Sequence, residues 1–348
     1  MVKRIKIGER WVGKGEPTFI IAEAGINHQG EIRIAKKLID VAAESGADSV
    51  KFQKRHVLSL LTKEGYEKEY DNPNSFGSTY GKHREALELS EDAFAEIKEY
   101  AEGKGLIFLA SPWDMVSADF LESLDITAFK MASADINNLP FLEHVARKKR
   151  PMIISTGMSN ITDVQIAYDL VTRFTDQLAI MQCTSTYPCD FEEINLNVLQ
   201  TYQKLFDCPI GYSGHEKGIA IPVAAVAMGA SIIERHFTLD RTMKGSDHAA
   251  SLEPVGLEKM IRDIRATEKA FGTAEKTKQK SEIPVEKKLK KSLTSAKPIM
   301  EGTRITVEHL TAKCPGTGIP PSDIQKLIGK VANRNIDADK ILQWEFFN

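Results

Sequence analysis

The chain has 348 residues, 42% of them hydrophobic and 27% charged, with 46 basic and 48 acidic side chains. This length allows one large domain with a smaller one beside it, and the composition is globular rather than disordered, collagen-like or coiled-coil. A net charge of -2 argues against a broad basic surface for nucleic acid but permits a local pocket for a small anion.

The N-terminus and the cysteines favour a cytoplasmic protein without a membrane segment. The run MVKRIKIGERW lacks the apolar core of a signal peptide. The most apolar stretch, from Gly218 to Ile233, contains Pro222 and is too short to span a bilayer, so we expect a buried helix that leads into a strand. The four cysteines show no CxxC pair and no metal-like spacing, which indicates a reducing compartment.

Short runs rich in apolar and β-branched residues alternate with segments of helical spacing over residues 1–272. Strands are expected at Phe19–Ala24, Asp48–Gln53, Leu106–Ala110, Ala128–Ala132, Met152–Ser155, Ala179–Cys183, Pro209–Tyr212 and Ser231–Glu234. In the segments between them, apolar residues recur at helical spacing, as in Ile34, Leu38 and Ala42. This repeat predicts an α/β fold, the TIM (β/α)8 barrel, with functional groups at the C-terminal ends of the strands. A doubly wound sheet is the alternative.

Two regions depart from the repeat. A long insertion over residues 54–89 follows the second strand, and long loops of this kind often form active-site lids or bind the substrate. After the last barrel helix, the lysine-rich run over 273–291 is interrupted by glutamates, so we interpret it as a linker rather than a nucleic-acid or membrane patch.

The C-terminal module, residues 292–348, is small enough that we expect it to pack on a barrel. Its strands are expected at Ser292–Ala296, Arg304–Thr306 and Leu342–Glu345.

Polar side chains gather where the expected barrel strands end. Lys51 and Lys130 lie inside apolar strands, and a buried charge is costly without a partner. Ringed by serine hydroxyls, the two lysines would form a cage for an anion that carries a phosphate and a carboxylate. The alternative is that they form structural ion pairs with Glu23 and Asp135.

Two histidines end consecutive expected strands, which are neighbours in a closed barrel. The neutral imidazoles of His215 and His236 would suit a divalent cation such as Mn²⁺, although a barrel histidine can also be a hydrogen-bonded wall residue. Glu23 and Asp247 are candidates for general acid–base catalysis, for hydrogen bonds to sugar hydroxyls, or for orienting a lysine or histidine.

Seven motifs, in order and spacing, resemble those of the sialic acid synthases over nearly the whole chain. They are IAEAGINHQG from Ile21, VKFQ from Val50, ISTGM from Ile154, CTSTYP from Cys183, GYSGH from Gly211, ERHFT from Glu234 and GSDH from Gly245. Residues 292–348, with KCPGTGI from Lys313, look like the antifreeze-protein-like SAF domain that such synthases append to their barrel.

This resemblance implies condensation of phosphoenolpyruvate with N-acetylmannosamine, releasing phosphate by C–O cleavage. N-acetylmannosamine 6-phosphate is the alternative acceptor, and a related product such as legionaminic or pseudaminic acid is a further one. The resemblance also implies a divalent metal, Mn²⁺ before Mg²⁺ or Co²⁺, and a domain-swapped homodimer in which each SAF domain caps the other subunit's active site.

Carried over residue by residue, the resemblance assigns the site. Phosphoenolpyruvate contacts are expected at Lys51, Ser111, Lys130, Ser133, Ser155, Ser185 and Ser213. The metal ligands are expected at His215 and His236, which are catalytic together with Glu23, the residue that assists proton transfer. Sugar contacts are expected at Gln53, Asn74, Asp135, Tyr187 and Asp247, and also at Glu23.

Two features depart from the bacterial pattern. Cys314 stands where many bacterial members carry an arginine that reaches over the sugar's N-acetyl group. The stretches that begin at Thr79 and Lys244 look closer to the animal-type enzymes, which take the 6-phosphate. The acceptor therefore stays open between the free and the phosphorylated sugar.

Two other classes of function compete with the synthase. A Schiff-base aldolase would use Lys130 or Lys51 as nucleophile, would need no metal and would be trapped by borohydride. An ice-binding or carbohydrate-binding module would need a flat repeating surface, and residues 292–348 contain no such repeat.

Overall fold

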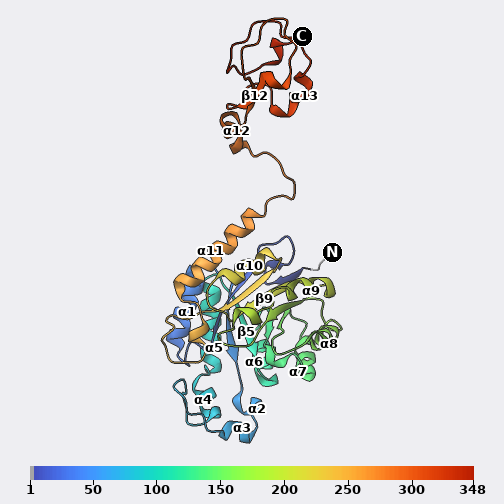
Figure 1. Cartoon of the computed structure of the whole chain (residues 1–348). Helices are drawn as coiled ribbons and strands as arrows, with labels where there is room; N and C mark the ends of the chain where they lie inside the picture. The colour runs from blue at the N-terminus through green and yellow to red at the C-terminus, as the bar shows by residue number, and fades with distance from the viewer. Residues whose placement is uncertain (1–3) are drawn as a thin grey trace. The chain divides into compact units, whose positions relative to one another are not determined.

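The computed structural model describes residues 4–348, which divide into two compact units after Phe271 (Figure 1). Each unit has its own hydrophobic core. No helix among the described residues is both long and apolar enough to cross a bilayer.

The first unit is a closed barrel of eight parallel strands, in the order β10-β3-β4-β5-β6-β7-β8-β9. The strands are β3 (Phe19–Gly25), β4 (Ser49–Lys54), β5 (Ile107–Pro112), β6 (Phe129–Met131), β7 (Met152–Ser155), β8 (Leu178–Cys183), β9 (Ile210–Gly214) and β10 (Ile232–His236). The barrel closes where Ile232 pairs with Phe19. The predicted TIM barrel is therefore confirmed, and all eight expected strands are present within two residues of their predicted ends.

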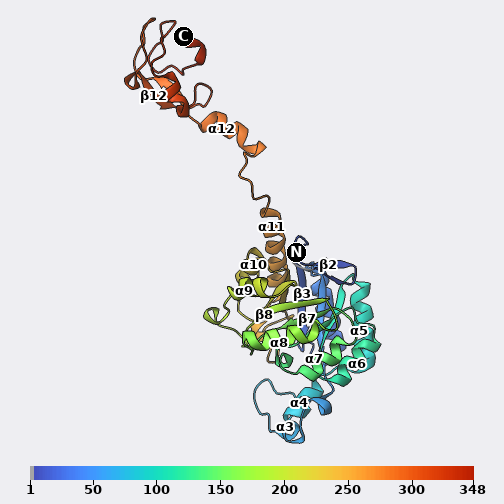
Figure 2. The same cartoon turned by 90° about the vertical axis from the view of Figure 1, so that its right-hand side faces the viewer.

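Helices surround the barrel in both views (Figures 1 and 2). One follows each strand after its loop: α1 (Ile32–Glu44), α5 (Glu91–Gly103), α6 (Met115–Ser123), α7 (Leu139–Ala146), α8 (Ile161–Val171), α9 (Val198–Leu205), α10 (Ala220–Ala227) and α11 (Pro254–Ala270). Local chemistry sets their ends, as in α8, where Asn160 and Asp163 form a capping box. The apolar stretch before residue 233 forms α10 and leads into β10, as predicted.

The barrel interior is apolar at one end and polar at the other. Because side chains alternate across a strand, Ile21 and Glu23 face one side of β3, and Lys51 and Gln53 share a side of β4. Ile21 belongs to a separate buried cluster that includes a hairpin of β1 (Ile5–Ile7) and β2 (Arg10–Val12). This hairpin, which the sequence did not predict, closes the N-terminal end of the barrel, so the lumen opens toward the strands' C-terminal ends.

The insertion after β4 contains α2 (Val57–Leu60), α3 (Lys63–Glu67) and α4 (Tyr80–Ala86). In both views α3 and α4 project from the barrel (Figures 1 and 2). Three short 3-10 helices lie in other loops of this unit: η1 (Ser133–Asp135), η2 (Phe191–Glu193) and η3 (His248–Ala250).

The second unit corrects several expectations. Its regular elements are η4 (Lys280–Glu282), α12 (Ile283–Leu289), β11 (Ser292–Ser295), η5 (Val307–His309), β12 (Leu310–Lys313), η6 (Pro321–Asp323), α13 (Ile324–Leu327) and η7 (Trp344–Phe346). Much of the predicted linker is therefore helical, in η4 and α12.

The strand prediction in this unit is right for one segment of three. β11 is present and pairs antiparallel with β12, a strand that we did not predict. The strands expected at Arg304–Thr306 and Leu342–Glu345 are wrong, because Arg304 makes one isolated bridge and the second segment runs into η7. In so small a unit, single bridges and tight turns replace longer ladders.

Candidate active site

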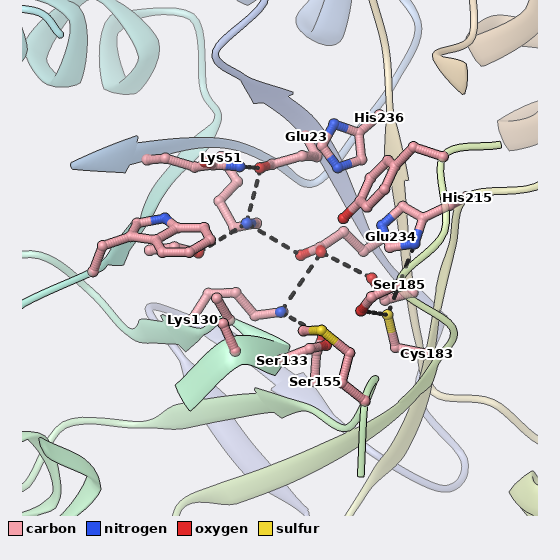
Figure 3. Close-up of a pocket in the computed structure, with 18 residues that line it drawn as sticks. Glu23, Lys51, Lys130, Ser133, Ser155, Cys183, Ser185, His215, Glu234 and His236 are labelled. Carbon is pink, nitrogen blue, oxygen red and sulfur yellow. Dashed lines mark hydrogen bonds and ion pairs between the residues drawn. The ribbon is translucent and has the colours of Figure 1, made fainter. Parts of the chain in front are cut away.

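A cavity of about 240 Å³ lies at the C-terminal ends of the barrel strands (Figure 3). Most of the predicted site residues line it: Glu23, Lys51, Gln53, Ser111, Lys130, Ser133, Ser155, Ser185, Tyr187, Ser213, His215 and His236. Its lining also includes residues to which we had assigned no role: Trp113, Ala132, Ala134, Met158, Cys183 and Glu234.

Two lysines and two carboxylates form the charged centre of the cavity. Lys51 Nζ lies 2.9 Å from Glu23 Oε2 and 3.7 Å from Glu234 Oε2, while Lys130 Nζ lies 3.6 Å from Glu234 Oε1. Figure 3 shows both lysines approaching Glu234. The pairing of Lys51 with Glu23 agrees with the ion-pair alternative. The pairing of Lys130 with Asp135 is wrong, because Glu234 reaches Lys130 from β10.

Serine hydroxyls bind these charged groups. Lys51 donates to Ser111 Oγ at 2.9 Å, and Lys130 donates to Ser155 Oγ at 2.6 Å. Ser213 donates to Glu234 Oε1 at 3.1 Å. The hydroxyls come from three different strands, so the barrel brings them around one small volume, where they can also hydrogen-bond an anion held by the lysines.

The two carboxyl groups differ in their titration. Burial raises the pKa of Glu23, and the nearby Lys51 only partly opposes this. Burial would also raise the pKa of Glu234, but Lys130 and Lys51 lower it to about 2. One site thus holds a carboxyl group that can be protonated and a carboxylate that stays ionised, the arrangement that acid–base chemistry needs. A protonated Glu23 would also leave a net positive charge for an anionic ligand.

The two predicted metal ligands lie beside each other, with ring centroids 5.4 Å apart. His215 Nδ1 donates to the carbonyl oxygen of Thr184 at 2.7 Å, which leaves the lone pair on Nε2. The Nδ1 atom of His236 is buried without a hydrogen-bond partner and lies 3.8 Å from Asp247 Oδ2. Burial lowers the pKa of His236 to about 3, so its imidazole is neutral.

His236 fits a divalent cation, because a histidine ligand must be neutral and its buried Nδ1 lacks a partner. Burial lowers the pKa of His215, but Cys183 and the Thr184 carbonyl raise it overall, so His215 would bind a cation in its neutral form, through Nε2. Within residues 4–348, no cluster of three or more His, Cys, Asp or Glu side chains is arranged to hold a metal. The other coordination positions would therefore belong to water or substrate.

A buried ion pair lies next to both histidines in sequence. The guanidinium of Arg235 donates from Nη1 to Glu216 Oε1 and from Nη2 to the Glu216 carbonyl oxygen, and both side chains are 0% exposed. Tyr212 Oη donates to Glu216 Oε2 at 2.7 Å. Because Glu216 follows His215 and Arg235 precedes His236, this pair ties together the backbone segments that carry the two imidazoles.

Three predicted sugar contacts lie outside the cavity lining. Asp247 approaches His236, as described above, and Asn74 Oδ1 accepts a hydrogen bond from Gly245 N at 3.2 Å, so the insertion meets the loop after β10. Asp135 lies in η1, where burial raises its pKa to about 6, and its Oδ1 accepts a hydrogen bond from Asn138 Nδ2 at 3.2 Å.

Glu234 was expected at the end of a strand, but no role was assigned to it. Strand alternation could have identified it, because Glu234 and His236 face the same side of β10. The signal for Cys183 and Trp113 was weaker, because a single apolar or aromatic residue near a strand end is equally compatible with the core.

The chain is similar to known proteins over nearly its whole length. The model of the NeuB family matches residues 38–276, and that of the SAF domain matches residues 290–348. The chain is 45% identical to N-acetylneuraminate-9-phosphate synthase of Homo sapiens over 97% of this chain and 94% of that protein. It is 40% identical to N,N'-diacetyllegionaminic acid synthase of Legionella pneumophila over 96% and 95%.

A solved structure shares the fold. The crystal structure of a sialic acid synthetase from Leptospira borgpetersenii superposes with a TM-score of 0.72 and 33% identity, covering 82% of this chain and 95% of that one.

Proposed function

Because the chain belongs to the NeuB family of synthases and carries a SAF domain, we propose that it condenses phosphoenolpyruvate with N-acetylmannosamine and releases phosphate. The observation that carries this proposal is the cage in which Lys51, Lys130 and strand-end hydroxyls surround one small cavity. Phosphoenolpyruvate carries a phosphate and a carboxylate on three carbons, which suits a cavity of about 240 Å³ with two cations.

The residues of the cage have different roles in the proposed reaction. Lys51 and Lys130 bind the two anionic groups, and the hydroxyls of Ser111 and Ser155 orient them. C3 of phosphoenolpyruvate attacks the aldehyde carbon of the open-chain sugar, and positive charge develops at C2, which Glu234 stabilises as an ionised carboxylate. Water adds at C2 and gives one proton to Glu23, which has already protonated the aldehyde oxygen. The bond between C2 and the bridging oxygen then breaks, its electron pair leaves with phosphate, and the C2 hydroxyl gives its proton to that phosphate as the keto group forms. Glu23, whose pKa is raised by burial, transfers the proton that the aldehyde oxygen takes up.

We further propose that His215 and His236 hold a divalent cation, Mn²⁺ before Mg²⁺ or Co²⁺. When bound there, the cation would polarise the acceptor's aldehyde. Asp247, whose Oδ2 lies 3.8 Å from His236 Nδ1, would orient that imidazole and bind the sugar's hydroxyl groups.

The second candidate acceptor is N-acetylmannosamine 6-phosphate. It is supported by the 45% identity to a relative whose name specifies a 9-phosphate product. The legionaminic acid synthase at 40% identity supports a related acetamido sugar instead. Carbon–carbon bond formation and loss of phosphate are the same in each case.

The first test measures phosphate released from phosphoenolpyruvate with Mn²⁺ and each acceptor, with a chelator as control. Acceptor-dependent release that the chelator abolishes supports the proposal. Phosphoenolpyruvate labelled with ¹⁸O in the bridging position should deliver the label to phosphate, and label retained in the sugar acid would contradict C–O cleavage. Metal-independent turnover with a borohydride-trapped adduct would favour the Schiff-base aldolase.

We also propose that the protein is a cytoplasmic homodimer in which the SAF domain of one subunit caps the barrel of the other. Sedimentation equilibrium tests the dimer directly, and a monomer at micromolar concentration would contradict it.

A further inference from the structure

A buried arginine contacts the wall of the active-site cavity from outside the set of residues discussed so far. Arg55 follows the end of β4, its side chain is only 2% exposed, and it touches two lining residues, Gln53 and Trp113. Burying a guanidinium is costly, and an apolar side chain of similar size often gives a more stable protein. The position of Arg55 therefore calls for an explanation other than stability.

Glu88, between α4 and α5, anchors this arginine. Its Oε2 accepts a hydrogen bond from the backbone N of Arg55 at 3.1 Å, and its Oε1 accepts one from Arg55 Nη1 at 3.3 Å. The same carboxylate lies 3.5 Å from Lys54 Nζ, which also donates to the carbonyl oxygen of Leu89 at 2.8 Å. The backbone and the guanidinium of Arg55 are thus both held by one side chain, which fixes where the remaining donors of the guanidinium point.

One of these donors sets the orientation of the Gln53 amide. Arg55 Nη2 donates to Gln53 Oε1, and Gln53 Nε2 donates to Glu23 Oε1 at 2.8 Å. A guanidinium has donors but no acceptor, so an amide bonded to it must present its oxygen to the arginine. The NH2 group of Gln53 then faces Glu23. That group has two hydrogens, of which Glu23 takes one, so the second is available to a ligand in the cavity.

The same guanidinium supports the ring of Trp113, which follows β5, the neighbour of β4 in the barrel. It lies 4.4 Å from the ring centroid, within the range of a cation–π contact. Trp113 N donates to the carbonyl oxygen of Lys54 at 3.1 Å, which ties the two strand ends together. Within residues 4–348, the buried Nε1 of Trp113 has no hydrogen-bond partner, so the ring is oriented by packing, in which Arg55 takes part.

We propose that Arg55 is a positioning residue for the acceptor side of the cavity, which fixes the Gln53 amide with its NH2 group toward Glu23 and the sugar and supports the ring of Trp113. This inference rests on the proposed function, in which Gln53 contacts the acceptor and Glu23 transfers a proton. Without the guanidinium the amide can turn by 180°, because a carboxyl group can donate to an amide oxygen as well as accept from an NH2 group. A turned amide presents an acceptor where the sugar needs a donor.

The first test is a double-mutant cycle on kcat/KM, with whichever acceptor sugar the full-length wild type turns over. Arg55→Met should lower kcat/KM by about ten- to a hundred-fold, the value of one charge-assisted hydrogen bond. In a Gln53→Ala background the same substitution should cost much less, because the amide through which Arg55 acts is gone. A purely structural role would give the same loss in both backgrounds.

Two further variants control for charge and folding. Lys54→Met removes the neighbouring cation from Glu88 and leaves both contacts of Arg55 in place, so kcat/KM should stay close to the wild-type value. Arg55→Lys keeps a cation beside Glu88 but lacks the planar group that reaches Gln53 and Trp113 together, so it should show a loss like that of Arg55→Met even where the latter folds poorly.

The second test does not depend on turnover. The chain has three tryptophans, and Trp11 and Trp344, which are 49% and 39% exposed, are replaced by phenylalanine so that Trp113 is the remaining indole. In this background Arg55→Lys should shift the fluorescence of Trp113 to longer wavelength and increase its quenching by acrylamide. Lys54→Met should change neither property.

The two tests distinguish a failure of this inference from a failure of the proposed function. Turnover by the wild type with no loss in either Arg55 variant, or with an equal loss in the Gln53→Ala background, would refute the positioning role and retain the proposed function. Unchanged Trp113 fluorescence would refute the support of the ring. A wild type that releases no phosphate with any acceptor would refute the proposed function, and a shift of Trp113 fluorescence in Arg55→Lys would then still support the contact of Arg55 with the cavity wall.

Discussion

The buried pair of Arg235 and Glu216 should stabilise the barrel far more than a surface ion pair does. Replacing Arg235 with methionine leaves the Glu216 carboxylate with the Tyr212 hydroxyl as its remaining side-chain donor and frees the carbonyl oxygens of Glu216 and Gly218. Removing one partner of a buried pair costs about 3–5 kcal/mol. For a unit of this size, that lowers the melting temperature by roughly 6–20 °C.

Differential scanning calorimetry of the full-length protein measures this change. The control is Arg262→Met, which breaks an ion pair with Asp263 on the surface of α11, where the arginine side chain is 65% exposed. Such a pair contributes about 1 kcal/mol or less. The double variant Arg235→Met with Glu216→Leu removes both charges and should be more stable than Arg235→Met alone.

The Arg235→Met variant also tests whether the buried ion pair positions the two histidines of the site. His215 and His236 flank the pair in sequence, so Arg235→Met should weaken Mn²⁺ binding below its melting temperature, which isothermal titration with Mn²⁺ detects. A melting temperature no lower than that of Arg262→Met, or a double variant less stable than the single one, would refute the reasoning.

Four further predictions concern single groups. Asp135→Asn should stabilise the protein above pH 6 by about 3 kcal/mol, because burial raises the carboxyl pKa from 3.8 to about 6 and ionisation therefore opposes folding. The gain should grow from pH 4 to 6 and then level off, and denaturant titration at pH 4 and pH 7 that shows equal gains would contradict it. Lys130→Met should raise KM for phosphoenolpyruvate by about a hundred-fold, because the lost charge-assisted contacts are worth about 3 kcal/mol, whereas an unchanged KM would remove Lys130 from the cage. His236→Ala should lower Mn²⁺ affinity and activity together, and activity without metal dependence would argue against the metal site. A chain that ends at Phe271 should keep the barrel's circular dichroism but lose most activity, and full activity would refute a capping role for the SAF domain.

The barrel could be predicted because its strands are buried on both faces and therefore read as continuous apolar runs between helices of clear periodicity. Short elements could not be predicted in this way. The hairpin β1–β2 has strands of three residues, Ile5–Ile7 and Arg10–Val12, too short for a pattern to stand out. β12 is half-buried along most of its length, so no alternation marks it.

Three of the four members of the charged centre, Glu23, Lys51 and Lys130, were predicted, and the pairing of Lys51 with Glu23 was one of the alternatives. Glu234 and its pairings with both lysines were not predicted, and the reason is geometric. The alternation of side chains along a strand can be read from the sequence, and it predicts that Lys51, Lys130 and Glu234 all point into the lumen. Which of them meet depends on how the barrel closes, and closure sets β10 beside β3, so that Glu234 comes within 4 Å of lysines from β4 and β6. A sequence that lists inward-facing residues therefore predicts the composition of a barrel site, whereas the ionisation state of each group follows only from the closed structure. Glu23 and Glu234 illustrate this, because the same residue type next to the same Lys51 has its pKa raised in one case and lowered in the other.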